Sequence, residues 1–268
     1  YRRFWRGESE EIRCERLTWL LQAFDAVGFS DGALAVAVLT LDRHAATTPQ
    51  NAEMSNDVSN RDLLAAVCIA LKVGSRNESQ LSLREVISYL ARDRIAFEDI
   101  VASELGILVQ LGFVVETPSP RDFLDTYAFQ MSRYGQRCRH LAEFLLELSY
   151  VDAPLCYRYA HCILAASAWA LALRAIEAPD QAFRTLLDDA CLFSARAVKE
   201  QMLQCCADLR LLWEGSLISR DAPFAAFVRH LHVKFARDAY YRVTMMAPPA
   251  NATHPLLLNL VAAIQTSL

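Results

Sequence analysis

The sequence predicts an all-α protein made of two tandem five-helix units with an additional helix at the C-terminal end. Apolar residues recur with the 3.6-residue spacing of amphipathic helices along most of the chain, and strand-type alternation of useful length does not compete with it. Glycine and proline, which interrupt helices, number only 8 and 9 among 268 residues. A pair of prolines near the middle divides the pattern into two halves of similar layout.

The first half contains five predicted helices. Gly28 ends the first of them, and Ser30 and Asp31 can cap the second. The third is apolar nearly all round, which is typical of a helix surrounded by others. The predicted helices cover residues 9–27, 31–46, 62–73, 83–91 and 97–111, with a polar loop over 47–60.

Pro118 and Pro120 mark the boundary between the halves, because each proline disfavours the α conformation in the residue before it. We therefore predict two domains, residues 1–117 and 118–268. The third helix of each half is rich in alanine, and such small side chains let neighbouring helices approach closely from several sides. The predicted helices of the second half cover residues 121–131, 137–150, 156–176, 181–190, 195–213 and 223–239.

Composition excludes several classes of protein. The net charge of −4 gives no basic footprint for nucleic acid. The eight cysteines lie mostly within apolar helical patterns, which indicates buried free thiols and a reducing compartment. No signal peptide is recognisable, and the longest apolar run is shorter than the roughly 20 residues that span a bilayer. We expect an intracellular protein that does not bind membranes.

No catalytic or metal-binding constellation is recognisable. His230 and His232 are two residues apart on a predicted helix and therefore point to different faces. Cys205 and Cys206 are adjacent and lack the spacing of a zinc site. The sequence contains neither a glycine-rich phosphate loop nor a nucleophile elbow. We expect no cofactor, no metal and no enzymatic activity.

Six segments, in order and in spacing, resemble the cyclin family of the mitotic type. Together they cover nearly the whole chain. They are RLTWLLQAF, LAVAVLTLDRHAA, LLAAVCIALKVGS, EDIVASELGILVQLGFVVETPSPRDFL, HLAEFLLELSYVDAPLCYRYAHCILAASAWALAL and KFARDAYYRV. The resemblance implies two cyclin boxes, residues 1–117 and 118–268, with a closing helix at the end of the second.

The resemblance implies a function as well. Cyclins are non-catalytic regulatory subunits that bind and activate a cyclin-dependent protein kinase and so control cell-cycle progression. By this likeness we expect a heterodimer with such a kinase in the nucleus and cytoplasm, with protein substrates or inhibitors as further partners. The alternative is a cyclin-fold transcription-associated factor or scaffold. A general transcription factor of this fold should carry basic residues for DNA, whereas this chain is acidic.

Lys72 and Glu104 match the lysine and glutamate with which cyclins hydrogen-bond the backbone around the kinase's regulatory helix. Bonds from ionised groups to backbone are stronger than neutral ones, which suits that role. Spacing alone favours ordinary positions, with Lys72 as a solvated helix terminus and Glu104 as a surface carboxylate.

Four apolar residues complete the kinase-binding surface that the resemblance implies. Leu108, Phe113 and Val115 match a partly exposed groove that receives an apolar side chain of the kinase helix. Spacing alone favours the protein core for all three. Val73 stands where many cyclins have an aromatic residue, so its contact is smaller here.

Arg13 and Asp42 match an arginine and an aspartate that pair between the first two helices of cyclins, so we expect a structural role for them. Such a buried pair is costly to break from one side.

A possible substrate-docking patch matches Ile12, Arg16, Trp19 and Gln22. Mitotic cyclins bind basic-hydrophobic motifs there, beside the tryptophan. Glu15 and Arg16 replace apolar residues of the patch. We therefore expect the usual motif to bind poorly or a different motif to be preferred.

Overall fold

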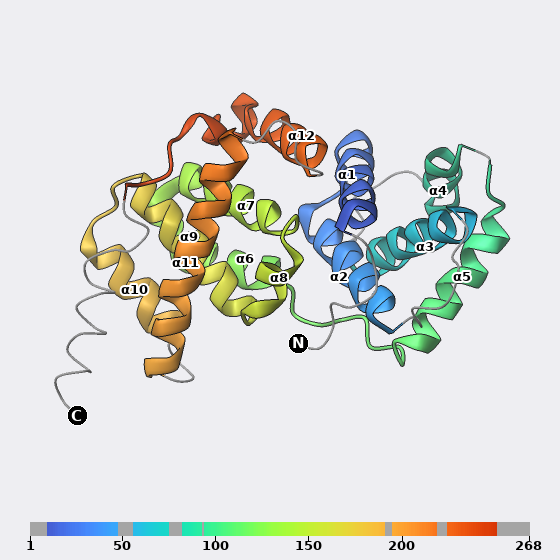
Figure 1. Cartoon of the computed structure of the whole chain (residues 1–268), viewed down its shortest axis with the longest axis horizontal. Coiled ribbons are helices and arrows are strands. Elements are labelled where there is room, and N and C mark those ends of the chain that lie inside the picture. Colours follow the sequence, from blue (N-terminus) through green and yellow to red (C-terminus); the bar gives the residue numbers. More distant parts are fainter. Residues whose placement is uncertain are drawn as a thin grey trace. The chain divides into compact units, whose positions relative to one another are not determined.

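The computed structural model describes residues 10–47, 56–74, 82–92, 94–190, 195–218 and 224–250. All regular structure in these residues is helical (Figure 1). The chain divides into two compact units, Tyr1–Ser119 and Pro120–Leu268.

The first unit is organised around α3, which packs against α2, α4 and α5. Alanines make these close approaches possible, since Ala65, Ala66 and Ala70 on α3 are fully buried. A capping box at Ser82 starts α4, where the Ser82 hydroxyl accepts from the Glu85 backbone N–H and the Glu85 carboxylate accepts from that of Ser82. The helices are α1 (Glu10–Val27), α2 (Asp31–Thr47), α3 (Asn56–Gly74), α4 (Leu83–Ala91) and α5 (Phe97–Gln110).

The second unit repeats this principle around α9, which packs against α6, α7, α10 and α11. Its α-helices are α6 (Pro120–Gln130), α7 (Gly135–Ser149), α8 (Ala153–Arg158), α9 (His161–Ala175), α10 (Asp180–Ala190), α11 (Ala195–Ile218) and α12 (Ala225–Phe235). Short 3₁₀ turns are η1 (Ser132–Tyr134), η2 (Asp238–Tyr240) and η3 (Val243–Met245).

Four of the predicted helices differ from the structure by more than two residues at an end. The helix expected over 195–213 continues to Ile218, and the one expected over 223–239 covers only Ala225–Phe235. The helix expected from residue 62 begins at Asn56, because an apolar segment held by tertiary packing can propagate into polar residues at little cost. The single helix expected over residues 156–176 is two helices. Tyr159 between them has an extended backbone, and its buried hydroxyl donates to the Asp208 carboxylate of α11 at 2.6 Å. The contact lies at the break between α8 and α9, where the local pattern predicted one continuous helix.

Candidate functional site

A charged pair lies where the end of α3 meets the middle of α5. The Lys72 ammonium donates to both carboxylate oxygens of Glu104, at 2.6 and 2.7 Å. The Lys72 side chain is half exposed, whereas that of Glu104 is 7% exposed. The structure thus brings the two predicted charged residues together at the surface of one unit, with the cation facing outward.

Glu104 also affects the pKa of a thiol, that of Cys68, which lies one turn before Lys72 in α3. Burial, reinforced by the negative charge of Glu104 and opposed by Lys72, raises the pKa of Cys68 to about 12. Cys68 is therefore protonated at any physiological pH and behaves as a small apolar side chain.

Apolar side chains adjoin the pair. Leu108, one turn after Glu104 on α5, is half-buried, as are Val73 and Val115. Phe113 is 62% exposed. None of the four is absorbed into the core, and we call these four residues the apolar surface.

The end of α5 sets the position of Phe113. Gly112 and Phe113 both adopt left-handed backbone conformations, with φ of 61° and 58°. The Phe113 N–H donates back to the Leu108 carbonyl at 2.7 Å, which closes the helix end. Left-handed backbone is a genuine outlier for a bulky residue, and such strain is found at functional sites. Here it holds an aromatic ring that its own chain does not bury.

A second polar cluster, which the sequence did not indicate, ties α3 to its neighbours. Asp62 of α3 accepts from the Ser103 hydroxyl of α5 and lies 3.4 Å from the His44 ring of α2. Burial favours the protonated form of Asp62, but the hydrogen bonds with His44 and Ser103 outweigh it and lower the pKa of this carboxyl. Because Ser103 precedes Glu104, the cluster also helps to fix α5 at the candidate site.

Arg13 and Asp42 form a buried bidentate pair between α1 and α2. The guanidinium donates to both carboxylate oxygens, at 2.9 and 2.8 Å. The side chains are 3% and 7% exposed. The pair contributes to the register of α1 on α2 and is not available to a partner.

The predicted docking residues share one face of α1, because they lie three or four positions apart. Ile12 is 46% exposed, Arg16 and Trp19 are half-buried, and Gln22 is exposed. Glu15 is also exposed. The face therefore combines two apolar side chains with two charged ones.

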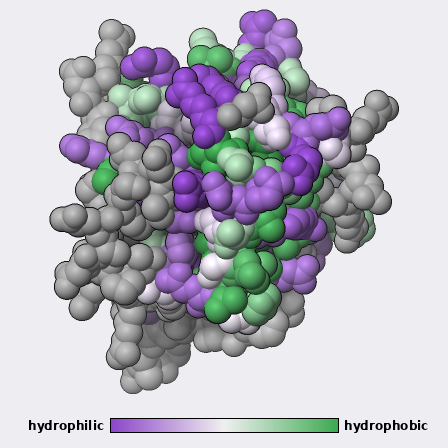
Figure 2. All heavy atoms as spheres, turned by 90° about the vertical axis from the view of Figure 1, so that its right-hand side faces the viewer, coloured by the Kyte–Doolittle hydropathy of each residue, from purple (hydrophilic) through white to green (hydrophobic). Residues whose placement is uncertain are grey.

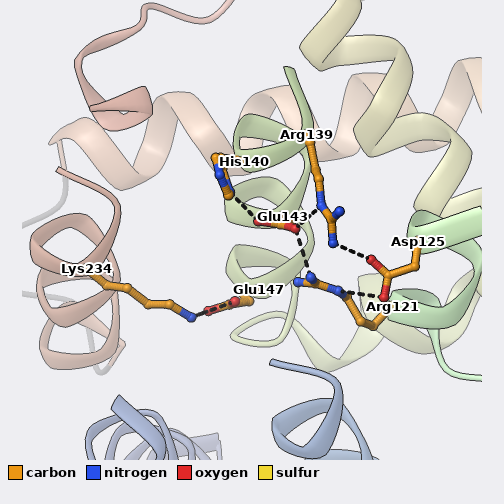
Figure 3. Close-up of polar contacts among 7 residues, drawn as sticks. All are labelled: Arg121, Asp125, Arg139, His140, Glu143, Glu147 and Lys234. Atoms are coloured by element: carbon orange, nitrogen blue, oxygen red, sulfur yellow. Dashed lines mark hydrogen bonds and ion pairs between the residues drawn. The ribbon is translucent and has the colours of Figure 1, made fainter. Parts of the chain in front are cut away.

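In the second unit, α7 carries two buried glutamates that sequence reading missed (Figure 3). Glu143 accepts from Arg121 and Arg139 at 2.8 and 2.9 Å, and its second oxygen lies 2.6 Å from the His140 ring. Asp125 bridges the two arginines at their outer side. Burial opposes ionisation of Glu143, but the hydrogen bond with His140 and the arginine charges outweigh it and lower its pKa to about 2.

Glu147, one turn further along α7, pairs with Lys234 of α12 at 2.8 and 3.0 Å (Figure 3). Both side chains are 4% exposed. The available signal in the sequence was two glutamates four residues apart in the otherwise apolar stretch 141–148, since buried carboxylates require partners. Both glutamates are engaged within the unit, so they serve its architecture.

Other kinds of site find no support in the described part of the chain. It holds no group of three or more histidine, cysteine, aspartate or glutamate side chains that could ligate a metal. Its helices also include none that is long and apolar enough to cross a bilayer.

Comparison with known proteins agrees with this architecture. Residues 118–248 match the family model of the cyclin C-terminal domain. The G2/mitotic-specific cyclin-A of Hydra viridissima is 24% identical over 160 residues, which make up 59% of this chain. The match spans about a third of that relative, 36% of its length.

Two solved structures share the fold. A viral cyclin from herpesvirus saimiri superposes with a TM-score of 0.57 at 15% identity, over 75% of this chain and 88% of the viral one. A chain of the CAK complex of Chaetomium thermophilum bound to ATP-γ-S gives a TM-score of 0.57 at 17% identity, over 96% and 78%. The predicted all-α fold of two tandem helical units is confirmed.

Proposed function

We infer that this chain, which belongs to the cyclin family through its C-terminal cyclin domain, is a regulatory subunit that binds and activates a cyclin-dependent protein kinase. Cyclins are non-catalytic subunits, so the activity belongs to the partner. We propose that the chain acts in the nucleus and cytoplasm and controls cell-cycle progression. We also propose that it consists of two cyclin boxes, residues 1–117 and 118–268. The Hydra relative named as a mitotic cyclin supports the cell-cycle role.

The observation that carries the proposal is the Lys72–Glu104 pair beside an open apolar surface. An ammonium has three donors, and Lys72 directs two hydrogen bonds to Glu104. Its third donor and exposed side are available to a backbone carbonyl of a partner. Glu104 retains acceptor capacity for a backbone N–H, since a carboxylate has about four lone-pair sites.

The apolar surface supplies the second half of the contact. We propose that Leu108, Phe113, Val115 and Val73, which are half-buried or exposed, receive an apolar side chain of the kinase's regulatory helix. Phe113 is 62% exposed in the free chain, so its burial on binding would contribute hydrophobic free energy.

The proposed mechanism is a population shift in the kinase. Kinase catalysis requires a lysine–glutamate ion pair that forms only when the regulatory helix is correctly placed. A rigid surface that binds the regulatory helix more tightly in its active position than in its inactive position shifts the kinase toward its active state. The cluster around Asp62 supplies that rigidity by joining α2, α3 and α5 behind the surface.

We further propose that the Ile12, Arg16, Trp19 and Gln22 face of α1 docks substrates or inhibitors. With Glu15 and Arg16 on this face, it favours a motif other than the usual basic-hydrophobic one.

The decisive experiment tests purified cyclin-dependent kinases one by one from a panel. For each kinase, it measures the affinity for the wild-type chain and its variants and the activation that they produce. Glu104→Ala and Lys72→Ala should each weaken binding about tenfold or more, since a hydrogen bond to a charged group contributes about 1.5–3 kcal/mol. Glu98→Ala is the matched control, because Glu98 lies on the same helix but is exposed and pairs with Arg84.

Full activation by a folded Lys72→Ala, Glu104→Ala double variant would refute this assignment. Retention of the wild-type chain on DNA, without any kinase in the panel responding, would favour the transcription-associated alternative.

A further inference from the structure

Two hydroxyl residues precede the prolines near the middle of the chain. Thr117 is followed by Pro118, and Ser119 is followed by Pro120. The prolines account for the break in the helical pattern, but that role does not require a hydroxyl residue before either of them. A serine or threonine followed by proline is also the minimal acceptor site of proline-directed protein kinases. The structure distinguishes the two acceptors from each other.

Ser119 has a structural role in the fold. It is 1% exposed and directly precedes Pro120, the first residue of α6. This is the N-cap position of the helix, where serine is among the favoured residues, and proline is favoured at the position after it. A kinase cannot reach a hydroxyl that is buried in this way.

Thr117 lies in a different environment. It is half-buried, and its neighbours Glu116 and Pro118 are exposed. Residues 114–119, all of which the structure describes, belong to no helix. The Thr117 N–H donates to the Val115 carbonyl at 3.1 Å, a contact between residues only two apart, and proline at the next position favours an extended backbone. Such a segment can enter the active site of a kinase without the unfolding of a helix.

The same segment follows exposed apolar side chains. Val109 of α5, and Phe113 and Val114 beyond its end, are 60%, 62% and 54% exposed. Figure 2 views the side on which α4 and α5 lie and shows hydrophobic side chains gathered there among hydrophilic ones. Val115, a member of the apolar surface, is only two residues before Thr117. A modification of Thr117 therefore changes the edge of the proposed kinase-binding site.

We propose that Thr117 is a phosphorylation site for a proline-directed serine/threonine kinase, and that the phosphate weakens binding of the free chain to its cyclin-dependent kinase. The regulatory half of this inference rests on the proposed function. In the reaction, the Thr117 hydroxyl oxygen attacks the γ-phosphorus of ATP, and the bond from that phosphorus to the β–γ bridging oxygen breaks. ADP leaves, and the hydroxyl proton passes to the catalytic aspartate of the modifying kinase.

The effect of the phosphate follows from its charge and its distance from the apolar surface. A phosphothreonine carries a charge of about −1.5 to −2 at pH 7. Two residues span at most about 7 Å, which is less than the Debye length of about 8 Å at physiological ionic strength, so salt screens the charge only partly. Under a partner that covers Val115 the phosphate loses hydration, and Glu116 adds a like charge beside it. Both effects oppose binding.

The first test maps the modification on the full chain. The chain is incubated with Mg²⁺–ATP and a purified, active proline-directed kinase that needs no cyclin, and tandem mass spectrometry locates the phosphate. Thr117 should carry phosphate and Ser119 should not.

Three variants control the mapping. Thr117→Val keeps the β-branched shape and should remove phosphate from this segment, whereas Thr117→Ser should retain it. Thr48, the third hydroxyl residue before a proline, lies outside the described residues, and Thr48→Val should leave the phosphate on Thr117 unchanged. Phosphate on Ser119, or its absence from Thr117, would overturn the inference.

The second test measures the affinity of the phosphorylated chain for the cyclin-dependent kinase that the unmodified chain activates. Phosphorylation should weaken binding about tenfold or more, since an uncompensated charge at an interface is costly. The Thr117→Val chain, treated with the same kinase, is the matched control and should keep the affinity of the unmodified wild type. Removal of the phosphate by a phosphatase should restore binding.

The outcomes separate this inference from the function beneath it. If the unmodified chain binds a kinase and phosphate on Thr117 leaves the affinity unchanged, the inference is wrong and the proposed function stands. If the unmodified chain binds no kinase, the proposed function fails and the regulatory half of the inference fails with it. The mass spectrum then still decides whether Thr117 is a modification site.

Discussion

Replacing Glu143 with glutamine should destabilise the second unit in a way that depends on pH. Glu143 is 2% exposed and is held by Arg121, Arg139 and His140. Glutamine keeps the shape of the side chain but removes the charge that these three groups surround. The experiment therefore tests whether the network in Figure 3 stabilises the fold through an ionised carboxylate.

The magnitude follows from the pKa. The pKa of Glu143 is about 2 in the folded chain, against an ordinary value of 4.5. At 1.36 kcal/mol per pH unit, this difference corresponds to about 3 kcal/mol of stability. Because the folded pKa is the lower one, the contribution is complete above about pH 4.5 and is lost as the pH falls toward 2. The loss in Glu143→Gln should thus be about 3 kcal/mol at pH 7 and should shrink below pH 4.5.

Urea unfolding of wild type and variant, followed by tryptophan fluorescence between pH 7 and pH 3, measures this difference. Trp169 and Trp213 are fully buried in the second unit and report on it. Asp125→Asn is the control, since Asp125 is 45% exposed and should cost less than about 1 kcal/mol. If the difference in free energy of unfolding between wild type and Glu143→Gln stays constant across this pH range, the electrostatic account is contradicted.

Two further predictions concern α1. Arg13→Ala leaves the buried Asp42 carboxylate without its bidentate partner and should lower the free energy of unfolding by about 3–5 kcal/mol. The double variant Arg13→Leu, Asp42→Leu should recover much of this loss, because it leaves no buried charge. Urea unfolding measures both variants, and equal stability of the two would refute the pairing argument. Replacing Glu15 by isoleucine together with Arg16 by leucine should increase affinity for a basic-hydrophobic docking peptide, measured by fluorescence anisotropy. Unchanged affinity would show that those two charges do not set the motif.

Local sequence was sufficient where the determining interactions are local. Helix periodicity, Gly28 as a stop signal and Pro118 as a break depend on contacts within a few residues, and the predicted all-α class follows from them. The division of the pattern into two halves arises in the same way, because a proline acts on the residue before it.

The polar networks could not be found in this way. Glu147 and Lys234 are 87 residues apart, and Tyr159 and Asp208 are 49 apart. Only the packed fold brings such groups within hydrogen-bond distance. The break at Tyr159 falls where the local pattern would continue the helix. The cluster of Asp62, His44 and Ser103 could not be predicted for the same reason, because its members are 18 and 41 residues apart.

The sequence by itself determined a helical protein of two units and, through resemblance, the residues that a kinase would contact. Only the tertiary structure decided which apolar residues of α5 face water. Ile107 and Leu105 look alike in a helical pattern, yet one is 1% exposed and the other 56%. Periodicity shows that a helix has an apolar side, but the neighbours that cover it are distant in sequence, so exposure is a property of packing.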